Sequence, residues 1–581
     1  METVNIKINN IPVVAKKGST ILEAAREIGI EIPTLCFLKE INEIGACRIC
    51  VVEVKGSRTL VASCIYPINE GMEIFTDTQR VHNARKTTLE LILSVHEQKC
   101  LSCVRSNNCE LQKLCKEYGV SSDSFNGEKP KHEIDDSALH MIRDNGKCIL
   151  CRRCVAACRK NQDVFVIGTN DRGFKTHIGC AFDLDLAEVS CVSCGQCIVA
   201  CPTGALSEKD NTDEVWAAIR NPKKHVIVQT APSIRATLGE SFDMPIGSNV
   251  EGKMVSALKL LGFDGVFDTD IGADMTIVEE AHEFVERVKT NGVLPMITSC
   301  SPGWINYCEH YFPEFIPNLS SCKSPQQMFG AIAKTWYAKK MNIDPADMVV
   351  VSVMPCTAKK YEVKRDFQSA AGEGIFDVDV AITTRELARM IERAGIRFTE
   401  LPDQKFDDPM GISSGAATIF GATGGVMEAA LRTAYEWVTG KTLEKLEFNE
   451  VRGFEGIKEA TYMLNDLPVR VAVASGLANA KKLLTSIKNG EAHYDFIEIM
   501  ACPGGCINGG GQPIQPASVR NFVDVVQKRA NALYDDDKKD VLRKSHENPA
   551  LKVIYDEFLG EYGGHKSHEI LHTQYVAKSR F

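Results

Sequence analysis

The stretch EIMACPGGCINGGGQP, residues 498–513, decides how this chain is organised. Its two cysteines, Cys502 and Cys506, are four residues apart, and glycines flank them on both sides. A soft metal centre needs thiolate ligands, and glycine lets backbone pass close to an inorganic core because it has no Cβ. A C-x3-C spacing is equally compatible with a glycine-rich turn that holds two unrelated thiols, so this stretch alone leaves both interpretations open.

Two further segments, TSCSPGW at 298–304 and MPCTAKKYE at 354–362, change that balance. Together with residues 498–513 they resemble the signature loops of the iron-only, or FeFe, hydrogenases. In that family the loops hold the H-cluster, a 4Fe–4S cubane joined to a two-iron subcluster with CO and CN ligands, which makes and splits dihydrogen. The resemblance covers nearly the whole chain, and it implies an enzyme of this kind.

Composition limits the class of protein. The 581 residues suggest roughly three to five domains, and 44% hydrophobic residues are enough to fill their cores. The net charge of −9 argues against a nucleic-acid partner. Neither a membrane-length apolar run nor a signal-peptide pattern is seen, so no membrane association is expected. Twenty-three clustered cysteines indicate metal sites in a reducing cytoplasm rather than a secreted disulfide scaffold.

Residues 1–80 are expected to form the first domain. An alternating strand at 4–8 precedes a helix at about 20–28, for which Ser19 is the expected N-cap. Four cysteines follow and could hold either a 2Fe–2S cluster or zinc: Cys36, Cys47, Cys50 and Cys64. The order of strand, helix and cysteine loop resembles β-grasp-like plant-type ferredoxins, and more closely the domain that opens the large electron-input subunit of respiratory complex I. That resemblance implies the 2Fe–2S cluster.

Residues 81–122 carry one histidine and three cysteines at metal-ligand spacing: His96, Cys100, Cys103 and Cys109. The spacing alone is compatible with a Cys3His zinc site. In the family that the chain resembles, the matching segment holds a 4Fe–4S cluster through one histidine and three cysteines. Cys115 lies beyond the pattern and is expected to be a buried free thiol.

A polar stretch at 123–135 is the expected linker to a third domain, residues 136–212, which contains an internal repeat of C-x2-C-x2-C-x3-C. This is the spacing of two-cluster bacterial ferredoxins, in which the fourth cysteine of each run serves the other cluster. The spacing therefore predicts two 4Fe–4S sites, one of Cys148, Cys151, Cys154 and Cys201, the other of Cys158, Cys191, Cys194 and Cys197. Cys180, between the runs, has no predicted partner.

Residues 220–520 read as an α/β catalytic domain. Apolar strands are expected at 225–229, 348–353, 378–382, 469–474 and 496–499, and helices at 275–288, 385–392 and 425–437. Several strands run directly into the cysteine loops, which predicts a shared buried site because ligands bind where α/β strands end. The tail, 521–581, is expected to be helical, with a solvated charge run at 535–540, and it resembles a segment that some relatives carry as a separate small subunit.

The resemblance also assigns residues around the H-cluster. It makes Cys356, Cys502 and Cys506 ligands of the cubane. It places Met354, Met500, Ser233 and Gln326 around the two-iron subcluster, and has Lys359 donate a hydrogen bond to a cyanide ligand. From the residues alone, the two methionines would be core packing and Lys359 a solvated surface lysine.

The same resemblance implies a proton path to solvent through Cys300, Glu280, Ser320, Glu283 and Arg287. Spacing alone favours a simpler interpretation, because Glu280, Glu283 and Arg287 share one helix face and could form an exposed salt-bridged surface. Carboxylates and a thiol can carry protons if their pKa values are tuned to the task.

The first loop departs from the family pattern. Many relatives have TSCCP, in which the first cysteine relays protons and the second holds the cubane, whereas Ser301 stands at the second position here. Three arrangements are open: Ser301 binds iron through oxygen, Cys300 becomes the ligand, or three cysteines hold the cubane. We expect Cys300 to be the relay and the fourth ligand to lie at or near Ser301.

Two functions compete at this point. One is a hydrogenase with a chain of iron–sulfur clusters; the other is a non-enzymatic relative, either an iron–sulfur assembly factor of the same fold or a hydrogen sensor. The complete loops favour the enzyme, and only Ser301 favours the other. No G-x-G-x-x-G is present, so NAD is not expected to bind this chain. The resemblance to complex I implies a flavin- and NAD(P)-binding subunit, a small 2Fe–2S subunit and ferredoxin as partners, in a complex that could be electron-bifurcating. A stand-alone ferredoxin-linked hydrogenase is the alternative.

Overall fold

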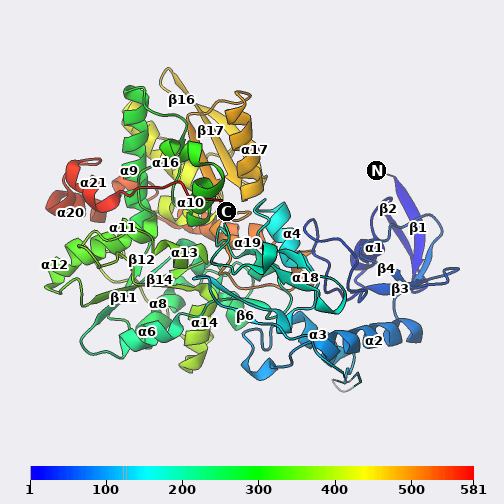
Figure 1. Ribbon diagram of the computed structural model, residues 1–581. Helices are drawn as coiled ribbons and strands as arrows, with labels where there is room; N and C mark the ends of the chain where they lie inside the picture. Colours follow the sequence, from blue (N-terminus) through cyan, green and yellow to red (C-terminus); the bar gives the residue numbers. More distant parts are fainter. Residues whose placement is uncertain (1, 122–123, 126, 581) are drawn as a thin grey trace.

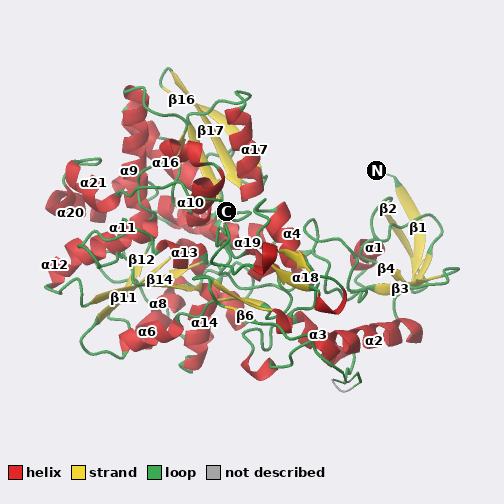
Figure 2. Ribbon diagram, viewed as in Figure 1, coloured by secondary structure: helices red, strands yellow, loops and turns green. Residues whose placement is uncertain are grey.

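The N-terminal third of the chain extends away from a larger α/β region in the computed structural model, which describes residues 2–121, 124–125 and 127–580 (Figures 1 and 2). The multidomain arrangement of mixed α/β parts that the sequence predicts is confirmed.

The first region is a five-stranded sheet crossed by one helix, with strand order β2-β1-β5-β3-β4. Its elements are β1 (Thr3–Ile8), β2 (Ile11–Lys16), α1 (Ile21–Glu27), β3 (Val51–Val54), β4 (Val61–Ala62) and β5 (Glu73–Phe75). Val4, Ile6 and Ile8 alternate inward along β1, which gives the sheet its buried face.

The predicted cap of helix α1 is off by one residue. Thr20, not Ser19, is the N-cap: its hydroxyl accepts the Glu23 N–H at 3.2 Å, and the Glu23 carboxylate accepts the Thr20 N–H at 3.0 Å. The reciprocal pair is a capping box, which requires the cap three residues before Glu23. Ser19 instead donates to the Lys16 carbonyl.

The second region is helical and carries the histidine and three cysteines. Its helices are α2 (Gln79–Val95) and α3 (Glu110–Glu117), with a short 3-10 turn at Cys100–Ser102. Cys115 is a free thiol as expected, but it is only half-buried. Of the predicted linker 123–135, residues 123 and 126 lie outside the described residues; the described part is irregular until strand β6.

The third region shows the internal repeat as two short helices that pack on each other, α4 and α5. Arg143 donates to the Cys180 thiol at 3.4 Å, which gives that buried cysteine a partner that the sequence did not suggest. The elements are β6 (Ile134–Asp135), β7 (Met141–Asp144), α4 (Arg153–Lys160), β8 (Gly168–Asn170), β9 (His177–Gly179), α5 (Gln196–Ala200) and β10 (Leu206–Glu208).

The α/β region contains two four-stranded sheets. One is fully parallel, in the order β12-β11-β14-β15; the other, β13-β18-β17-β16, is parallel except for the hairpin of β16 and β17. The strands are β11 (His225–Thr230), β12 (Gly265–Asp268), β13 (Met296–Ile297), β14 (Met348–Met354), β15 (Val380–Thr383), β16 (Ile457–Leu464), β17 (Leu467–Ser475) and β18 (Phe496–Met500).

Helices cover both sheets (Figure 2). They are α6 (Thr212–Ile219), α7 (Pro232–Arg235), α8 (Glu251–Leu261), α9 (Asp270–Lys289), α10 (Pro302–Tyr311), α11 (Pro325–Ile332), α12 (Ala338–Met341), α13 (Ala358–Glu362), α14 (Thr384–Arg393), α15 (Gly415–Thr418), α16 (Gly425–Thr439) and α17 (Leu477–Lys488). The strands and helices predicted for this region are confirmed, with ends that shift by a few residues.

Four parallel strands deliver the signature loops to one place. β11 runs into residues 231–233, β13 into 298–304, β14 into 355–362 and β18 into 501–513. Because the two sheets turn these carboxyl ends toward one another, loops separated by up to 270 residues line one cavity.

The C-terminal segment wraps the α/β region as expected, with α18 (Ala517–Arg520), α19 (Val525–Lys539), α20 (Pro549–Ile554) and α21 (His565–Leu571). Helix α19 packs on α15, α20 on α9, and α21 on α11, which places the red C-terminal helices beside α9 in Figure 1.

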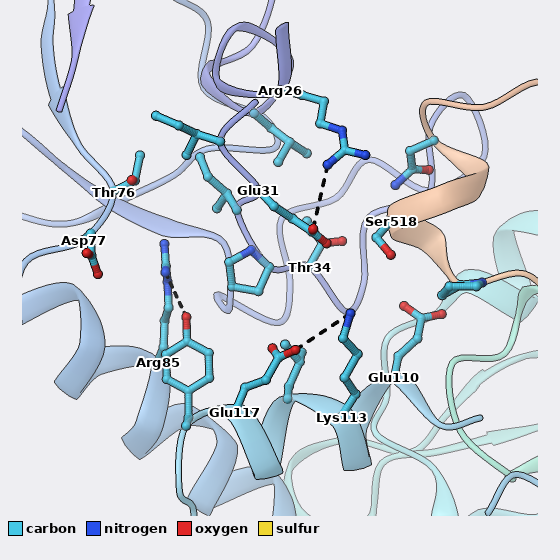
Figure 3. Close-up of a pocket in the computed structure, with 18 of the residues that line it drawn as sticks. Arg26, Glu31, Thr34, Thr76, Asp77, Arg85, Glu110, Lys113, Glu117 and Ser518 are labelled. Atoms are coloured by element: carbon cyan, nitrogen blue, oxygen red, sulfur yellow. Dashed lines mark hydrogen bonds and ion pairs between the residues drawn. The ribbon is translucent and has the colours of Figure 1, made fainter. Parts of the chain in front are cut away.

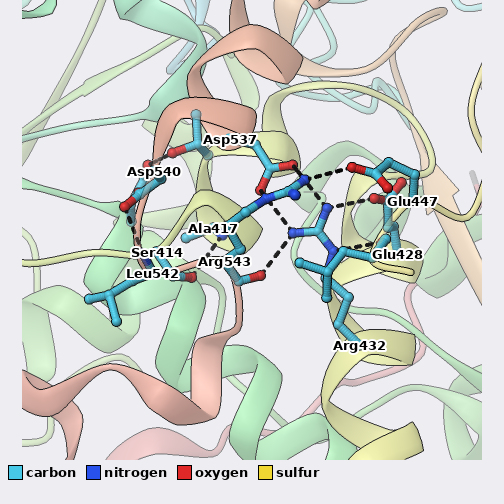
Figure 4. A network of polar contacts seen from close by, with 12 residues as sticks. Ser414, Ala417, Glu428, Arg432, Glu447, Asp537, Asp540, Leu542 and Arg543 are labelled. Atoms are coloured by element: carbon cyan, nitrogen blue, oxygen red, sulfur yellow. Dashed lines mark hydrogen bonds and ion pairs between the residues drawn. The ribbon is translucent and has the colours of Figure 1, made fainter. Parts of the chain in front are cut away.

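The charge run 535–540 is solvated only in part: Asp535, Lys538 and Lys539 are exposed as the sequence predicts, but Asp537 is not. Asp537 is fully buried, and Arg432 of helix α16 binds both of its oxygens, at 2.9 and 3.0 Å, while Arg543 binds at 2.7 Å (Figure 4). Burial raises the pKa of Asp537, but the hydrogen bonds from both arginines outweigh it and hold the pKa below its usual value. The run therefore anchors the C-terminal segment.

A polar cleft marks the seam between the first region and the rest of the chain (Figure 3). Arg26 and Glu31 line it from the first region, Lys113 and Glu117 from α3, and Ser518 from α18. Beside this cleft, apolar side chains also cross the seam: Leu35 and Ile49 of the first region pack with Leu89, Leu111 and Leu114 of α2 and α3.

Candidate active site

A buried cavity lies where the four loops meet. The predicted residues that line it are Cys300, Ser301, Gln326, Met354, Cys356, Lys359, Met500, Cys502 and Cys506. Met354 and Met500 are almost fully buried, so they form apolar wall rather than surface. The structure thus brings together nine of the residues that the sequence placed at one centre.

Three of the thiols form a close group. Burial raises the pKa values of Cys502 and Cys506, and the neighbouring Cys356 raises both further. Such a group becomes thiolate only beside a cation, which is the property of a metal-ligand set. Gly505, at φ +95°, allows this turn, since a Cβ there would lie 2.6 Å from the Thr423 backbone nitrogen.

Cys300 and Ser301 both face this cavity. The Ser301 hydroxyl oxygen accepts the Ala501 N–H at 3.3 Å, directly beside Cys502. The Cys300 carbonyl accepts a hydrogen bond from Lys359 Nζ at 3.3 Å. Both side chains lie in the same wall of the cavity. Ser301 lies toward the loop that carries Cys502, and Cys300 lies toward helix α9.

Lys359 is held by a set of buried polar groups. Its ammonium donates to the Glu362 carboxylate and to the Ser324 hydroxyl, each at 2.8 Å. The same carboxylate oxygen accepts from Gln326 at 2.9 Å. Glu362 and Ser324 were not singled out from the sequence, although Glu362 lies within the MPCTAKKYE motif, three residues after Lys359. An i, i+3 acid on a short helix is the signal that could have found it.

Ser233 lies one layer behind the cavity wall. Its neighbours Ala231 and Pro232 line the cavity, while the Ser233 hydroxyl accepts a hydrogen bond from Gln512 at 3.2 Å. Gln512 also donates to the Cys506 carbonyl at 3.1 Å. Ser233 is therefore tied to the cysteine loop through Gln512.

Helix α9 carries the acidic residues of the expected proton path. Glu283 and Arg287 form the salt bridge that the spacing suggests, but the helix face that they share with Glu280 is not an exposed one. Glu280 is fully buried, and neither of its carboxylate oxygens has a hydrogen-bond partner among the described residues. Burial, together with the charge of Glu283, raises the pKa of Glu280 to about 8. A carboxyl group that titrates near neutral pH can both take up and release a proton under working conditions.

The outer end of the expected proton path, at Glu283 and Arg287, is partly open to solvent. The buried Ser320 hydroxyl donates to Glu283 Oε2 at 3.1 Å, and Arg287 donates to Glu283 Oε1. Arg287 also donates to the carbonyls of Val293, Asn318 and Leu319. The Ser320 hydroxyl also acts on Glu280, whose pKa it lowers against the effect of burial. Glu280, Ser320 and Glu283 therefore form a row that ends at Arg287.

The four cysteines of the first region lie on one loop system. The Cys50 and Cys64 sulfur atoms are 3.3 Å apart, and the Cys36 and Cys47 N–H groups each donate to the other's sulfur at 3.4 Å. All 23 cysteines of the chain are free thiols. Four thiols that approach this closely without a disulfide fit a metal or cluster site.

His96 ends helix α2 and turns inward. Its Nδ1 is buried and has no hydrogen-bond partner in the described part of the chain. Burial lowers the pKa of the ring, so the neutral form that binds metals is favoured. An orphaned, neutral ring nitrogen fits the ligand role expected beside Cys100, Cys103 and Cys109.

The two cysteine runs interleave in the way their spacing predicts. Cys148, Cys151, Cys154 and Cys201 line one small cavity. Cys158 and Cys191 both raise the pKa of Cys197, which burial raises first, so these thiols gather at a second point. Helices α4 and α5 carry or border the last two cysteines of each run, and because they pack on each other, the fourth cysteine of one run lies near the first three of the other.

The cysteine sites form a continuous series. The Asn42 amide donates to the Cys36 carbonyl at 2.7 Å and to the Cys151 carbonyl at 3.0 Å, which joins the first region to the third. Arg105 donates to the Cys201 carbonyl at 3.2 Å and joins the second. At the inner end Gly510 lies against Cys194, where a Cβ would be 2.3 Å from the carbonyl oxygen, so the third region touches the cavity loop itself.

Comparison with known proteins agrees with this arrangement. Residues 224–510 match the iron only hydrogenase large subunit, C-terminal domain. Over its full length the chain is 48% identical to the NADP-reducing hydrogenase subunit HndD of Solidesulfovibrio fructosivorans, with 99% of that relative covered. The chain belongs to the FeFe hydrogenases.

Two further comparisons agree with this assignment. The chain is 46% identical to iron hydrogenase 1 of Clostridium pasteurianum, over 98% of this chain and 99% of that relative. An FeFe hydrogenase structure from Chlamydomonas reinhardtii is similar, with a TM-score of 0.57 and 44% identity over 64% of this chain and all of that chain.

Four more families match outside the catalytic region. They are a 2Fe-2S iron-sulfur cluster binding domain at 1–79, the NADH-ubiquinone oxidoreductase-G iron-sulfur binding region at 85–123, a 4Fe-4S dicluster domain at 147–205 and the iron hydrogenase small subunit at 523–578. The hydrogenase therefore carries iron–sulfur clusters besides its H-cluster. Among the described residues, no helix is long and apolar enough to cross a membrane.

Proposed function

We propose that this FeFe hydrogenase is the catalytic subunit of an NAD(P)- and ferredoxin-linked complex, in which a chain of clusters carries electrons to or from the H-cluster. The single observation that carries the proposal is the continuous series of cysteine sites, joined by Asn42 at the outer end and by Gly510 at the inner end.

The proposed inventory is one 2Fe–2S cluster, three 4Fe–4S clusters and the H-cluster. The outer 2Fe–2S cluster takes the four cysteines of residues 36–64, and the first 4Fe–4S cluster takes His96 with Cys100, Cys103 and Cys109. The other two 4Fe–4S clusters take the two crossed sets of the internal repeat. The orphaned His96 Nδ1 and the cavity lined by Cys148, Cys151, Cys154 and Cys201 support this distribution.

At the centre, Cys356, Cys502 and Cys506 hold the cubane, with the fourth ligand at or near Ser301. When bound, the H-cluster supplies the iron at which protons and electrons combine reversibly into dihydrogen. Met354 and Met500 exclude water from one wall, Gln326 fixes Glu362, and Glu362 with Ser324 aims Lys359 into the cavity, where its ammonium is placed to donate to an anionic ligand.

The proposed proton path runs from Cys300 through Glu280, Ser320 and Glu283 to the surface at Arg287. Glu280 is the central group because its raised pKa lets it exchange protons near neutral pH. The row matters because the centre is buried, and a reaction that consumes two protons there needs carriers that lead to solvent.

Partners are proposed from similarity. The relative HndD is named as a subunit of an NADP-reducing hydrogenase, and residues 85–123 match a region of the complex I G subunit. A flavin- and NAD(P)-binding subunit and a small 2Fe–2S subunit would then deliver electrons to the first region, and ferredoxin would be a second electron partner in a bifurcating reaction.

Purification of the native complex tests this proposal. Bound flavin and hydrogen-dependent reduction of NAD(P) would support the complex, and a requirement for oxidised ferredoxin would support bifurcation. An isolated, flavin-free chain that reduces ferredoxin from hydrogen and never copurifies with other subunits would instead support the stand-alone hydrogenase.

A further inference from the structure

The C-terminal segment places a histidine against the outer end of the proton path. His572 follows helix α21 and forms a β-bridge with Cys322. Backbone hydrogen bonds flank it, from Lys323 N to the Leu571 carbonyl and from Thr573 N to the Ser321 carbonyl, each 2.8 Å long. Since the chain is paired on both sides, the ring is held in a defined position.

Both ring nitrogens of His572 have hydrogen-bond partners. Nδ1 lies 2.8 Å from the Ser321 hydroxyl, and Nε2 lies 3.2 Å from the Glu279 carboxylate. The Ser321 hydroxyl is in turn 3.3 Å from Glu283 Oε2. Glu283, Ser321, His572 and Glu279 therefore form an unbroken hydrogen-bonded row that branches from the proposed path.

The chemistry of Glu279 fixes the direction of these bonds. Burial raises its pKa, but hydrogen bonds from His572 and Tyr555 outweigh burial and hold the pKa below its usual value, so the carboxylate is ionised. An ionised carboxylate only accepts, so Nε2 carries the ring proton of neutral His572 and Nδ1 accepts from the Ser321 hydroxyl. A negative group on Nε2 also stabilises the ring once it is protonated.

His572 links this row to a histidine at the surface. The His572 side chain is 5% exposed, against 16% for that of Glu283, and the exposed ring of His568 stacks on it with centroids 3.9 Å apart and planes 10° apart. The guanidinium of Arg287, at the end of the proposed path, donates to four backbone carbonyls. An imidazole can exchange protons near neutral pH, which a guanidinium cannot.

We propose that His572 is a proton carrier between Glu283 and solvent, so that the C-terminal segment supplies an exit for the hydrogenase reaction. The inference rests on the proposed path as far as Glu283. For hydrogen oxidation, protonated Glu283 donates its proton to Ser321 Oγ while the Ser321 hydroxyl proton moves to His572 Nδ1. This leaves Glu283 ionised, Ser321 unchanged and His572 as imidazolium, which then releases the proton to water; hydrogen evolution runs the same steps in reverse.

The groups around His572 come from several elements. Glu279 and Glu283 come from α9, Cys322 from the loop after residue 320, Tyr555 from the turn after α20, and His568 from α21. One ligand atom each of Glu283, Cys322 and His572 lie within 4.8 Å of one another, close enough for a cation. Both ring nitrogens are already hydrogen-bonded, however, so the geometry favours a proton carrier over a metal ligand.

The test compares matured His572→Gln and His572→Ala hydrogenase with wild type, in weakly buffered solution and with an artificial electron acceptor. Glutamine can keep both hydrogen bonds but cannot relay a proton. We expect hydrogen oxidation to fall about tenfold in both variants, less than the roughly 100-fold loss for a central carrier, because Glu283 keeps a small exposed edge. Imidazole in the buffer should restore His572→Ala. His565→Gln changes an exposed histidine at the start of helix α21, seven residues before His572; it is the matched control and should behave as wild type.

Glu283→Gln separates failure of the branch from failure of the path. If Glu283→Gln is slow while His572→Gln runs at the wild-type rate and imidazole changes nothing, the branch is wrong and the path stands. If Glu283→Gln runs at the wild-type rate, the path itself is wrong and the branch with it. A slow Glu283→Gln that imidazole does not rescue, beside a rescued His572→Ala, is the expected result.

A second measurement needs no turnover. Deuterium exchange at the carbon between the two ring nitrogens, followed by mass spectrometry across a pH series, reports protonation of His572 directly. Glu279→Gln removes the carboxylate that stabilises the imidazolium, so the midpoint of exchange should move to lower pH. An unchanged midpoint would show that Glu279 does not act on the ring and would overturn the proposed relay chemistry.

Discussion

Cys300 and Ser301 are the residues on which the catalytic centre depends most. A thiol is a better proton carrier near neutral pH than a serine hydroxyl, and also a better iron ligand, so one thiol cannot serve both needs well. The structure lines the cavity with both side chains and places the Ser301 oxygen against the Ala501 N–H, beside Cys502. This position agrees with a fourth ligand at or near Ser301.

Cys300→Ala is expected to abolish turnover while leaving the iron content and the cubane spectrum nearly unchanged, because the role proposed for the thiol is to relay protons and not to hold iron. Ser301→Cys should leave proton transfer intact and strengthen the cubane. Electron paramagnetic resonance of the matured variants is the measurement. Loss of the cubane signal in Cys300→Ala would instead make Cys300 the ligand.

Glu280→Gln is expected to stop catalysis and yet stabilise the protein at higher pH. The folded chain holds the Glu280 proton up to about pH 8, whereas the unfolded chain releases it near pH 4.5. Folding therefore binds a proton between these values, and stability falls as pH rises from 4.5 toward 8. Glutamine cannot ionise and removes this slope.

The difference in melting temperature between Glu280→Gln and wild type should accordingly be small at pH 5 and should grow in favour of the variant toward pH 8, while hydrogen oxidation falls about 100-fold or more. Equal melting temperatures across the series would mean that Glu280 is ionised in the folded protein, and would remove it as the central carrier. Glu286→Gln, on the exposed side of the same helix, is the control.

At the scale of elements, the sequence predicts those helices, strands and cysteine sites that have a regular apolar period or a fixed ligand spacing. Alternating and continuous apolar runs place β1, β11 and β14 correctly, and the crossed C-x2-C runs predict which cysteines share a cavity. Local sequence cannot show which charges are buried by distant elements. Asp537 lies in a run that looks solvated, and only the approach of Arg432, 105 residues away, makes it a core group.

Asp537→Asn is expected to loosen the C-terminal segment. It leaves the buried Arg432 and the half-buried Arg543 without their shared carboxylate, a loss of about 3–5 kcal/mol, because Arg432 has no exposed surface through which water could compensate. Melting temperature should fall by roughly 5–10 °C. Asp535→Asn changes an exposed neighbour on the same helix and should leave the melting temperature unchanged. Equal effects of the two substitutions would contradict this account.

At the scale of the whole molecule, the signature loops and ligand spacings are readable in the sequence because each motif is local. The acidic residues of α9 cannot be recognised in this way, because Glu280 and Glu283 become a path only when Ser320 and the C-terminal segment cover them. Ser324, Glu279 and His572 follow the same rule, because each acts through a partner from another element and no pattern within one stretch distinguishes it from an ordinary surface residue. Glu362 is the exception, since its i, i+3 spacing from Lys359 on one short helix could have identified it.

The cysteine series also predicts the metal content of the mature chain. One 2Fe–2S cluster, four cubanes and the two-iron subcluster add up to about 20 iron atoms. Iron analysis together with electron paramagnetic resonance measures this. A preparation without a 2Fe–2S signal would contradict the assignment of that cluster to Cys36, Cys47, Cys50 and Cys64. Zinc in place of iron at His96, Cys100, Cys103 and Cys109 would contradict the 4Fe–4S assignment there.

His96→Ala tests whether the series conducts electrons in the proposed way. The substitution removes a ring nitrogen that has no other buried partner, so it should disturb one 4Fe–4S cluster and leave the fold intact. The signature loops lie in a different region, and hydrogen chemistry with a small artificial donor should remain largely unchanged. Activity with the physiological partner should fall if its electrons enter through the outer clusters. His82→Ala, an exposed histidine on the same helix, is the control. Equal loss with both donors would mean that His96 supports the catalytic region itself and does not lie on a route into it.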